Sequence, residues 1–289
     1  TERIIRAPEQ EYTRMLVDAA RLHTAPAEEV EAGEELLRVE HLKKYFDVKK
    51  KNKKLSLKAV DDVSFTLNKG EVLGIVGESG CGKSTLMKTI IGLNPPMAGD
   101  ILIRGKSIID SGKEIPEIQR SLGIMYQSGA LFGSLTVLEN VRFPLDQFSK
   151  LPLEARNLTA QMLLNAMEMP GSANLTPGEL SGGMIKRAGI ARALSLGATI
   201  LLLDEPSAGL DPITAANLDQ TIRKLRDNLG ATFVIVSHEL KSIFRIADRC
   251  IMLDPKTRSI IADGAPNDLQ KNSPNPWVRQ FFNAQPDAE

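Results

Sequence analysis

Gly77-Glu78-Ser79-Gly80-Cys81-Gly82-Lys83-Ser84 is the stretch that decides the fold. An apolar run from Glu71 to Val76, typical of a buried strand, leads into it, and Thr85 to Ile91 continues from it at helical period. Glycines let a backbone wrap around a phosphate with successive N–H groups pointing inward, at the positive end of the following helix. Strand, glycine-rich loop and helix in this order predict a phosphate-binding loop, and a chance glycine-rich turn would need neither neighbour.

The side chains of this loop suit a nucleotide and its metal. Lys83 can reach the β- and γ-phosphates, and the hydroxyl of Ser84 can ligate Mg²⁺. We therefore expect residues 77 to 84, together with the adjacent Thr85, to bind ATP and Mg²⁺.

A second motif ends another buried strand. Ile200-Leu201-Leu202-Leu203 runs directly into Asp204 and Glu205. At a strand end, Asp204 is placed to hold the metal through water, and Glu205 can polarise an attacking water as a general base. The alternative is a structural pair of acids that caps the next helix.

Composition limits the classes of partner. The 289 residues include 36 Lys plus Arg and 36 Asp plus Glu, so the zero net charge gives no reason to expect nucleic acid as a ligand. Cys81 and Cys250 are too few for a disulfide framework or a metal cluster, which favours a reducing cytoplasm, and Cys250 is expected in the core. No apolar run approaches the roughly 18 residues of a spanning helix, so we expect a soluble chain that touches membranes only through partners.

Pattern changes along the chain predict three parts. Residues 1–35 read as an N-terminal helical extension and linker, 36–264 as the main domain, and 265–289 as a C-terminal tail. The tail holds Trp277, the only tryptophan, either docked on the main domain or presented to a partner.

The main domain reads as α/β, a P-loop NTPase with a mainly parallel core sheet. Short apolar runs at 36–39 and 59–67 predict an N-terminal antiparallel β subdomain, its strands joined by a basic loop around Lys49 to Lys54. That lysine run is interpreted as a solvated loop, with phosphate binding as the alternative. The stretch from about 128 to 180 lacks strand signals and predicts an inserted helical subdomain.

A third motif, Leu180-Ser181-Gly182-Gly183-Met184, stands ahead of a helix that starts with Lys186-Arg187, and predicts another anion site at a helix start. With Ser207-Ala208-Gly209-Leu210-Asp211 and His238 after a buried strand, five motifs occur in the order of an ABC transporter ATPase. The chain resembles that family from about Leu36 to Gly264.

The resemblance implies further roles. Gln127 resembles the glutamine that senses Mg²⁺ and the γ-phosphate, and His238 resembles the switch histidine at the γ-phosphate. Phe46, with Tyr45 as the second choice, resembles the aromatic that stacks on adenine. Ser181, Gly182 and Gly183 would act on the nucleotide of a second cassette. Met184 replaces the usual signature glutamine, which leaves that one contact without an equivalent.

The resemblance also implies a place and partners. Ser128-Gly129-Ala130-Leu131-Phe132 and Asn275 to Phe282 resemble ATPases of bacterial mammalian-cell-entry-type phospholipid transport, whereas the first third resembles oligopeptide-importer ATPases, in which a segment like residues 1–25 ends a preceding cassette. We favour lipid trafficking, because the cysteine-containing tail of the peptide group is absent. We expect transmembrane permease partners, a second cassette, no nucleic acid, and a peripheral position on the cytoplasmic side of the inner membrane. The alternatives are a non-transport ABC protein and a module that binds ATP without turnover.

Overall fold

The structure is a computed structural model that describes residues 33–50 and 53–285. Contacts divide these residues into two compact units. Unit 1 comprises residues 120–233, and unit 2 comprises residues 33–119 and 234–285. The predicted N-terminal helix lies outside the described residues.

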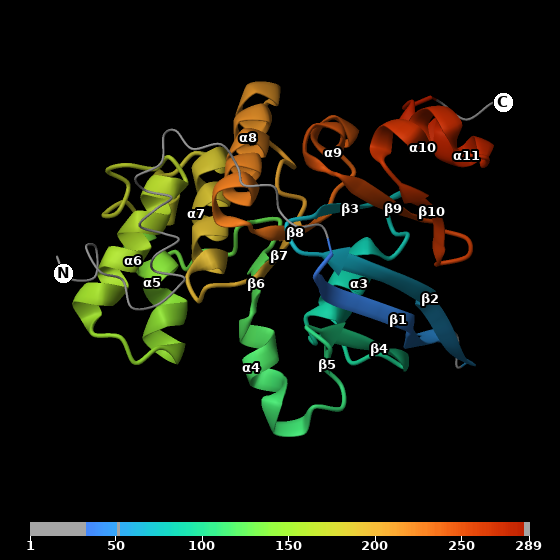
Figure 1. The fold of residues 1–289 in the computed structure, drawn as a ribbon, viewed down its shortest axis with the longest axis horizontal. Helices are drawn as coiled ribbons and strands as arrows, with labels where there is room; N and C mark the ends of the chain where they lie inside the picture. Colours follow the sequence, from blue (N-terminus) through green and yellow to red (C-terminus); the bar gives the residue numbers. More distant parts are fainter. Residues whose placement is uncertain (1–32, 51–52, 286–289) are drawn as a thin grey trace. The chain divides into compact units, whose positions relative to one another are not determined.

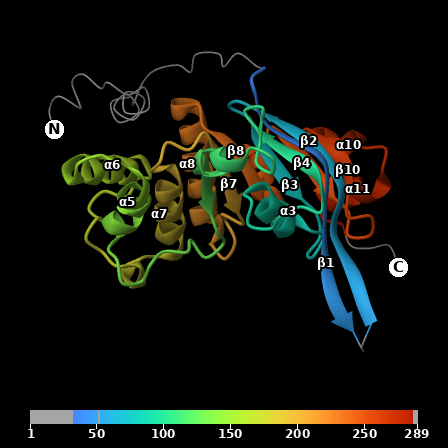
Figure 2. The same cartoon turned by 90° about the horizontal axis from the view of Figure 1, so that it is seen from below.

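Unit 2 contains an antiparallel sheet with strand order β2-β1-β4-β5. Its strands are β1 (Glu35–Lys50), β2 (Lys53–Asn68), β4 (Ala98–Ile103) and β5 (Lys106–Ser107). Figure 2 shows that β1 and β2 form one long hairpin. The predicted antiparallel pair is confirmed, but its connecting segment is shorter than the expected loop around Lys49 to Lys54, because the ladder continues until Lys49 pairs with Lys54 and Lys50 with Lys53. Tyr45, Phe46 and Val48 favour extended backbone and carry β1 into the lysine run.

The second sheet of unit 2 positions the phosphate-binding loop. β3 (Val72–Val76), buried along its length, runs parallel to β9 (Arg249–Leu253), and β10 (Ile260–Gly264) is antiparallel to β9. Arg249 ties these strands together, with ion pairs to Glu71 at 2.7 Å and Asp263 at 2.9 Å. α3 (Lys83–Ile90) follows the loop after β3 and contacts β1 and β2. The strand, loop and helix predicted around residues 71–91 are therefore confirmed.

The C-terminal tail packs onto unit 2 as two short helices, α10 (Pro266–Asn272) and α11 (Pro276–Phe282). α10 contacts β10 and α9 (Leu240–Ile246), as Figure 1 shows for the red end of the chain. Phe282 is buried, with its ring edge-on to Phe244 at 6.0 Å. Of the two interpretations of the tail, docking is therefore the correct one up to residue 285. Trp277 itself stays partly exposed.

Unit 1 pairs β6 (Leu122–Met125) in parallel with β7 (Ile200–Asp204). Its helices are α5 (Val137–Phe148), α6 (Leu153–Ala166), α7 (Gly182–Leu194) and α8 (Pro212–Leu229). α7 contacts both strands and the other three helices, which makes it the centre of the unit (Figure 1). The helices expected between 128 and 180 are present as α5 and α6, and the bounds of a separate subdomain stay a prediction.

Two elements lie where the chain passes between the units. α4 (Ile115–Arg120) follows a 3₁₀ turn at Gly112–Glu114, and β8 (Thr232–Val236) leads from residue 233 back into unit 2. A second 3₁₀ turn, Pro177–Glu179, precedes α7. Among the described helices, none is both long and apolar enough for a membrane crossing.

Candidate active site

The phosphate-binding loop is held in shape by two glycines and a buried lysine. Gly77 and Gly82 have φ of 140° and 113°, and a Cβ at Gly82 would collide with the carbonyl oxygen of Ala59. Lys83 is 8% exposed, and its Nζ donates hydrogen bonds to the carbonyl oxygens of Gly77 at 2.7 Å and Glu78 at 2.9 Å. The loop is thus closed by its own lysine, while Ser84 stays exposed.

Arg258 supports the loop from outside. Its guanidinium donates a hydrogen bond to the carbonyl oxygen of Gly80, and its own carbonyl accepts one from the backbone N–H of Asp61 at 2.8 Å. Arg258 has φ of 61°, in the left-handed region that few non-glycine residues adopt. The turn between β9 and β10 therefore joins the phosphate loop to the β1–β2 hairpin.

The two candidate adenine-stacking aromatics have different surroundings. The hydroxyl of Tyr45 donates a hydrogen bond to the carboxylate of Asp61, and this bond raises the pKa of the tyrosine. The ring of Phe46 is 37% exposed, with the ammonium of Lys44 at 5.1 Å from its centroid. The geometry favours Phe46 over Tyr45, although its role remains a prediction.

His238 is presented by a turn at the end of β8. The backbone N–H of buried Ser237 donates to the carbonyl oxygen of Ile75 at 3.2 Å, and Ser237 Oγ accepts from the N–H of Glu239 at 3.0 Å. His238 is exposed and directly follows this contact with β3, the strand that leads into Gly77. Unit 2 thus holds Phe46, residues 77–85 and His238.

Unit 1 holds the other predicted site residues. Asp204 ends β7 and is 9% exposed, and the next residue, Glu205, is half-buried with φ of 50°. A left-handed glutamate immediately after a buried strand is a strained position of the kind found at functional sites. Gln127 is exposed after β6, and burial together with the nearby Asp204 carboxylate raises the pKa of the neighbouring Tyr126.

Lys186, on the second turn of α7, is a residue that sequence reasoning missed. It is 6% exposed, and its Nζ donates to the carbonyl oxygen of Gln127 and, at 3.1 Å, to that of Glu205. Burial lowers the pKa of Lys186, opposed by the carboxylates of Glu205 and Asp204. The sequence pattern marked it only as part of a basic helix start.

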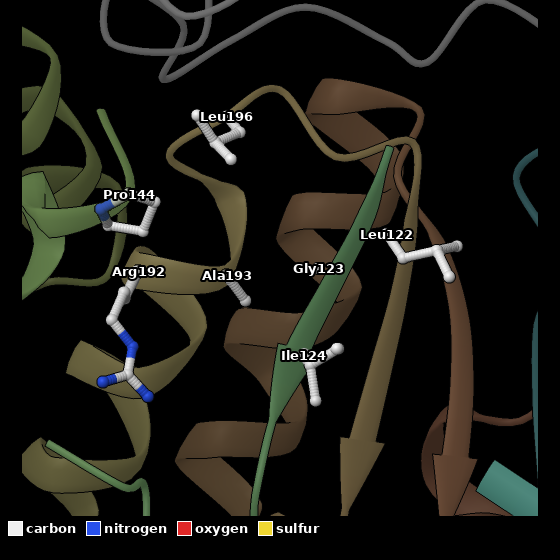
Figure 3. Close-up of a pocket in the computed structure, with 7 residues that line it drawn as sticks. All are labelled: Leu122, Gly123, Ile124, Pro144, Arg192, Ala193 and Leu196. Atoms are coloured by element: carbon white, nitrogen blue, oxygen red, sulfur yellow. The ribbon is translucent and has the colours of Figure 1, made fainter. Parts of the chain in front are cut away.

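Arg192, two turns further along α7, was also missed. Its guanidinium donates to the carbonyl oxygens of Ala130 at 2.7 Å and Gly129 at 2.9 Å, which fixes the segment after Gln127. Figure 3 shows Arg192 beside a small cavity of about 130 Å³ that β6, Pro144 and the end of α7 line. None of the predicted site residues lines this cavity.

The signature turn starts α7. Ser181 is its N-cap, and its hydroxyl accepts a hydrogen bond from the backbone N–H of Met184 at 3.3 Å. Gly182 is exposed, whereas a Cβ on buried Gly183 would lie 2.5 Å from Cγ2 of Thr214. Gly183 therefore has a packing reason of its own, the close approach of α8 to α7.

Comparison with known proteins gives the family. Residues 60–208 match the ABC transporter family. The chain is 40% identical over 223 residues to the intermembrane phospholipid transport system ATP-binding protein MlaF of Escherichia coli K12, which covers 77% of this chain and 82% of that protein. The chain belongs to the ABC transporter family. It is an ATP-hydrolysing subunit, as the five ordered motifs indicated.

The names of two further relatives of this ABC cassette give two substrates, phospholipid and ribonucleotide. MlaF of Haemophilus influenzae is 37% identical over 230 residues, covering 79% of this chain and 86% of the relative. The probable ribonucleotide transport ATP-binding protein mkl of Mycobacterium tuberculosis is 40% identical over 225 residues, covering 77% of this chain and 62% of the relative. The family is thus common to relatives whose names give different substrates.

Solved structures confirm the fold class of the cassette. The dimeric ATP-binding cassette MJ0796, in a post-hydrolysis state with ADP and Pi, superposes with a TM-score of 0.71 at 29% identity, covering 80% of this chain and 98% of that one. CbiO1 from Clostridium perfringens gives 0.72 at 27% identity, covering 83% and 92%. The α/β P-loop fold predicted from the sequence is confirmed.

Proposed function

We propose that this ABC cassette energises phospholipid trafficking between membranes, working with separate transmembrane permease subunits on the cytoplasmic side of the inner membrane. The observation that carries this proposal is the 40% identity to the phospholipid transport protein MlaF over 82% of that relative. The resemblance of residues 128–132 and 275–282 to the same class of ATPase supports it.

Each proposed role follows from side-chain chemistry. Lys83 and the backbone of residues 77–85 bind the phosphates, and Phe46 stacks on adenine. Glu205 removes a proton from the attacking water. Gln127 contacts Mg²⁺ and the γ-phosphate, and His238 contacts the γ-phosphate.

The donor atoms at three positions suit Mg²⁺. Ser84, Gln127 and Asp204 offer a hydroxyl, an amide oxygen and a carboxylate, and oxygen is the ligand that Mg²⁺ prefers. When bound, the ion would neutralise charge that develops on the phosphates. The residues present therefore fit the cofactor.

A second cassette completes the proposal. Ser181, Gly182 and Gly183 form a glycine-rich start of a 13-residue helix, α7, which is suited to phosphate. We assign them to the nucleotide of a partner cassette, identical or related to this one.

The substrate is tested on the assembled transporter. The tagged chain, purified from native membranes in mild detergent, is expected to bring down a polytopic membrane protein and phospholipid, identified by mass spectrometry. The ATPase activity of that complex should rise in phospholipid vesicles and not respond to added oligopeptides or to ribonucleotides other than ATP and its product ADP. Recovery of the chain without any membrane protein, or stimulation by such a ribonucleotide, the substrate class in the name of the mkl relatives, would overturn the lipid assignment.

Glu205→Gln tests the general base. The amide cannot accept a proton, so turnover is expected to slow by roughly 10² to 10⁴ while ATP affinity stays near that of the wild type. Steady-state ATP hydrolysis and a nucleotide titration measure the two quantities. Asp227→Asn is the matched control, because Asp227 is an exposed acid at the end of α8 that pairs with Arg226. This variant should leave turnover and ATP affinity unchanged. Wild-type turnover in the glutamine variant contradicts the role of Glu205.

A further inference from the structure

Lys186 occupies a position that an apolar residue would fill at lower desolvation cost. It lies on α7, one turn beyond the signature turn at residues 180–183, and is 6% exposed. Burying an ammonium is unfavourable unless hydrogen bonds replace its water. Lys186 has such bonds, donated to the carbonyl oxygens of Gln127 and Glu205.

The two acceptors lie far apart in the sequence. Gln127 is 59 residues from Lys186, and Glu205 is 19 residues from it. Each acceptor is the backbone of a residue whose side chain has a proposed role at the site, Glu205 as the general base and Gln127 as the sensor of Mg²⁺ and the γ-phosphate. A single ammonium therefore joins three segments of unit 1, namely the signature helix, the segment after β6 and the end of β7.

The bond to Glu205 fixes an unusual backbone. Glu205 has φ of 50°, and its carbonyl oxygen also accepts a hydrogen bond from the N–H of Ala208 at 3.3 Å. A non-glycine residue persists in the left-handed region only when its surroundings hold it there. Lys186 is one of the groups that holds it.

We propose that Lys186 is a positioning residue, which fixes the backbones of Glu205 and Gln127 to the helix that carries the signature turn. A displacement of α7 then moves the proposed base, together with the glutamine proposed to sense Mg²⁺ and the γ-phosphate. The inference rests on the roles proposed above for Glu205 and Gln127. Lys186 acts through these residues and needs no contact of its own with the nucleotide.

Arg187 supplies a matched control on the same helix. Its guanidinium donates to the carbonyl oxygen of Met167 at 2.7 Å and pairs with Glu168 at 3.0 Å, away from the backbones of Gln127 and Glu205. Arg187→Met thus removes one cation and its packing contacts from α7 without touching the proposed link.

The first test compares Lys186→Met, Lys186→Arg and Arg187→Met in the full chain, by kcat and KM for MgATP and by thermal unfolding. Lys186→Met is expected to lower kcat about tenfold, the scale of one charged hydrogen bond, with KM within about twofold of wild type. Lys186→Arg should recover part of kcat, because its guanidinium can donate to two carbonyls. Arg187→Met should leave kcat within about twofold.

A double-mutant cycle separates positioning from general damage. Because part of the effect of Lys186 passes through Glu205, Lys186→Met should lower the slow residual rate of Glu205→Gln by a smaller factor than it lowers the wild-type kcat. An equal loss of kcat in both backgrounds, or normal kcat in Lys186→Met, overturns the proposal. If Lys186→Met does not fold, the same cycle with Lys186→Gln is judged by the same criteria. A wild-type rate in Glu205→Gln instead contradicts the proposed base, so the two failures are distinguishable.

Discussion

The phosphate loop at residues 77–84 and the signature turn at residues 180–183 use similar local devices for different ends. Each is rich in glycine, and each starts a helix. Each also has a buried lysine: Lys83, within the phosphate loop, is 8% exposed, and Lys186, three residues after the signature turn, is 6% exposed. Lys83 donates to carbonyls five and six residues away and closes its own loop. Lys186 donates to carbonyls 19 and 59 residues away and ties its helix to other segments.

The difference indicates separate tasks. A loop closed on itself is preorganised, which suits tight binding of a ligand by one chain. The signature turn has no hydrogen bond from Lys186, which donates instead to the backbones of Gln127 and Glu205. A displacement of the helix start can therefore move these two segments. The hydrogen bonds of the signature turn thus suit coupling of α7 to other segments, and those of the phosphate loop suit binding of a ligand.

Gly82→Ala should break the phosphate loop and have the largest effect. The added Cβ collides with the carbonyl of Ala59 at φ 113°, and strain and overpacking together cost about 3 kcal/mol or more, at least roughly 100-fold in ATP affinity. A nucleotide titration measures this. Gly80→Ala, at φ 77° with open space around it, is the control and should lose less. Equal losses would show that the collision with β2 is not what shapes the loop.

Ser181→Ala should leave the loop's function intact and slow turnover. We expect ATP affinity of the isolated chain to stay unchanged, because the signature is assigned to a partner's nucleotide, and kcat at high protein concentration to fall about tenfold with the lost hydroxyl. Thr136→Ala removes a comparable N-cap, that of α5, where Thr136 Oγ1 accepts from the N–H of Glu139 at 3.2 Å.

Both cap variants should lose about 1 kcal/mol of unfolding free energy, measured by denaturant titration. Only Ser181→Ala should lose turnover. A comparable drop in kcat for Thr136→Ala would mean that Ser181→Ala acts only by destabilising its helix. The contrast between the signature turn and the phosphate loop would then be lost.

Arg258→Ala should have the smallest effect on ATP affinity, and it tests whether the phosphate loop needs support from outside. Arg258 is the outside support of the phosphate loop at Gly80, so its loss should weaken ATP binding about threefold, which corresponds to the low end of the net range of about 0.5–1.5 kcal/mol for a typical hydrogen bond. Lys256→Ala, an exposed cation in the same turn, should not change affinity. Identical behaviour of the two variants in the same titration would mean that the loop needs no support beyond Lys83.

The sequence predicted local features well and remote contacts hardly at all. The strand, loop and helix around Gly77 and the acids after β7 were placed correctly, because buried runs and glycine spacing act over a few neighbouring residues. The order β2-β1-β4-β5 and the extended hairpin were not, since the ladder through Lys49 and Lys54 depends on pairing between strands. Polar lysines alone indicate a loop, and cross-strand hydrogen bonds override that tendency.

The site showed the same limit. Residues proposed to bind nucleotide, such as Lys83, stand in recognisable motifs, whereas Lys186, Arg192 and Arg258 act on backbone carbonyls 19 to 178 residues away. Every residue has a backbone carbonyl, so the residue type at the acceptor position does not show that a cation binds there. No rule based on motif spacing could therefore have identified these three cations. Gly183 was assigned to phosphate alone, and its contact with Thr214 became visible only with α8 in place.

The two thiols make this cassette convenient for site-specific labelling. Cys81 and Cys250 are the only cysteines of the chain and are 1% and 0% exposed. Burial raises the pKa of both thiols, that of Cys250 to about 12, so little reactive thiolate exists near neutral pH. A cysteine introduced on the exposed side of α7 or α8 would react against a low background, and a fluorophore there would report the motion of the signature helix without prior removal of native thiols.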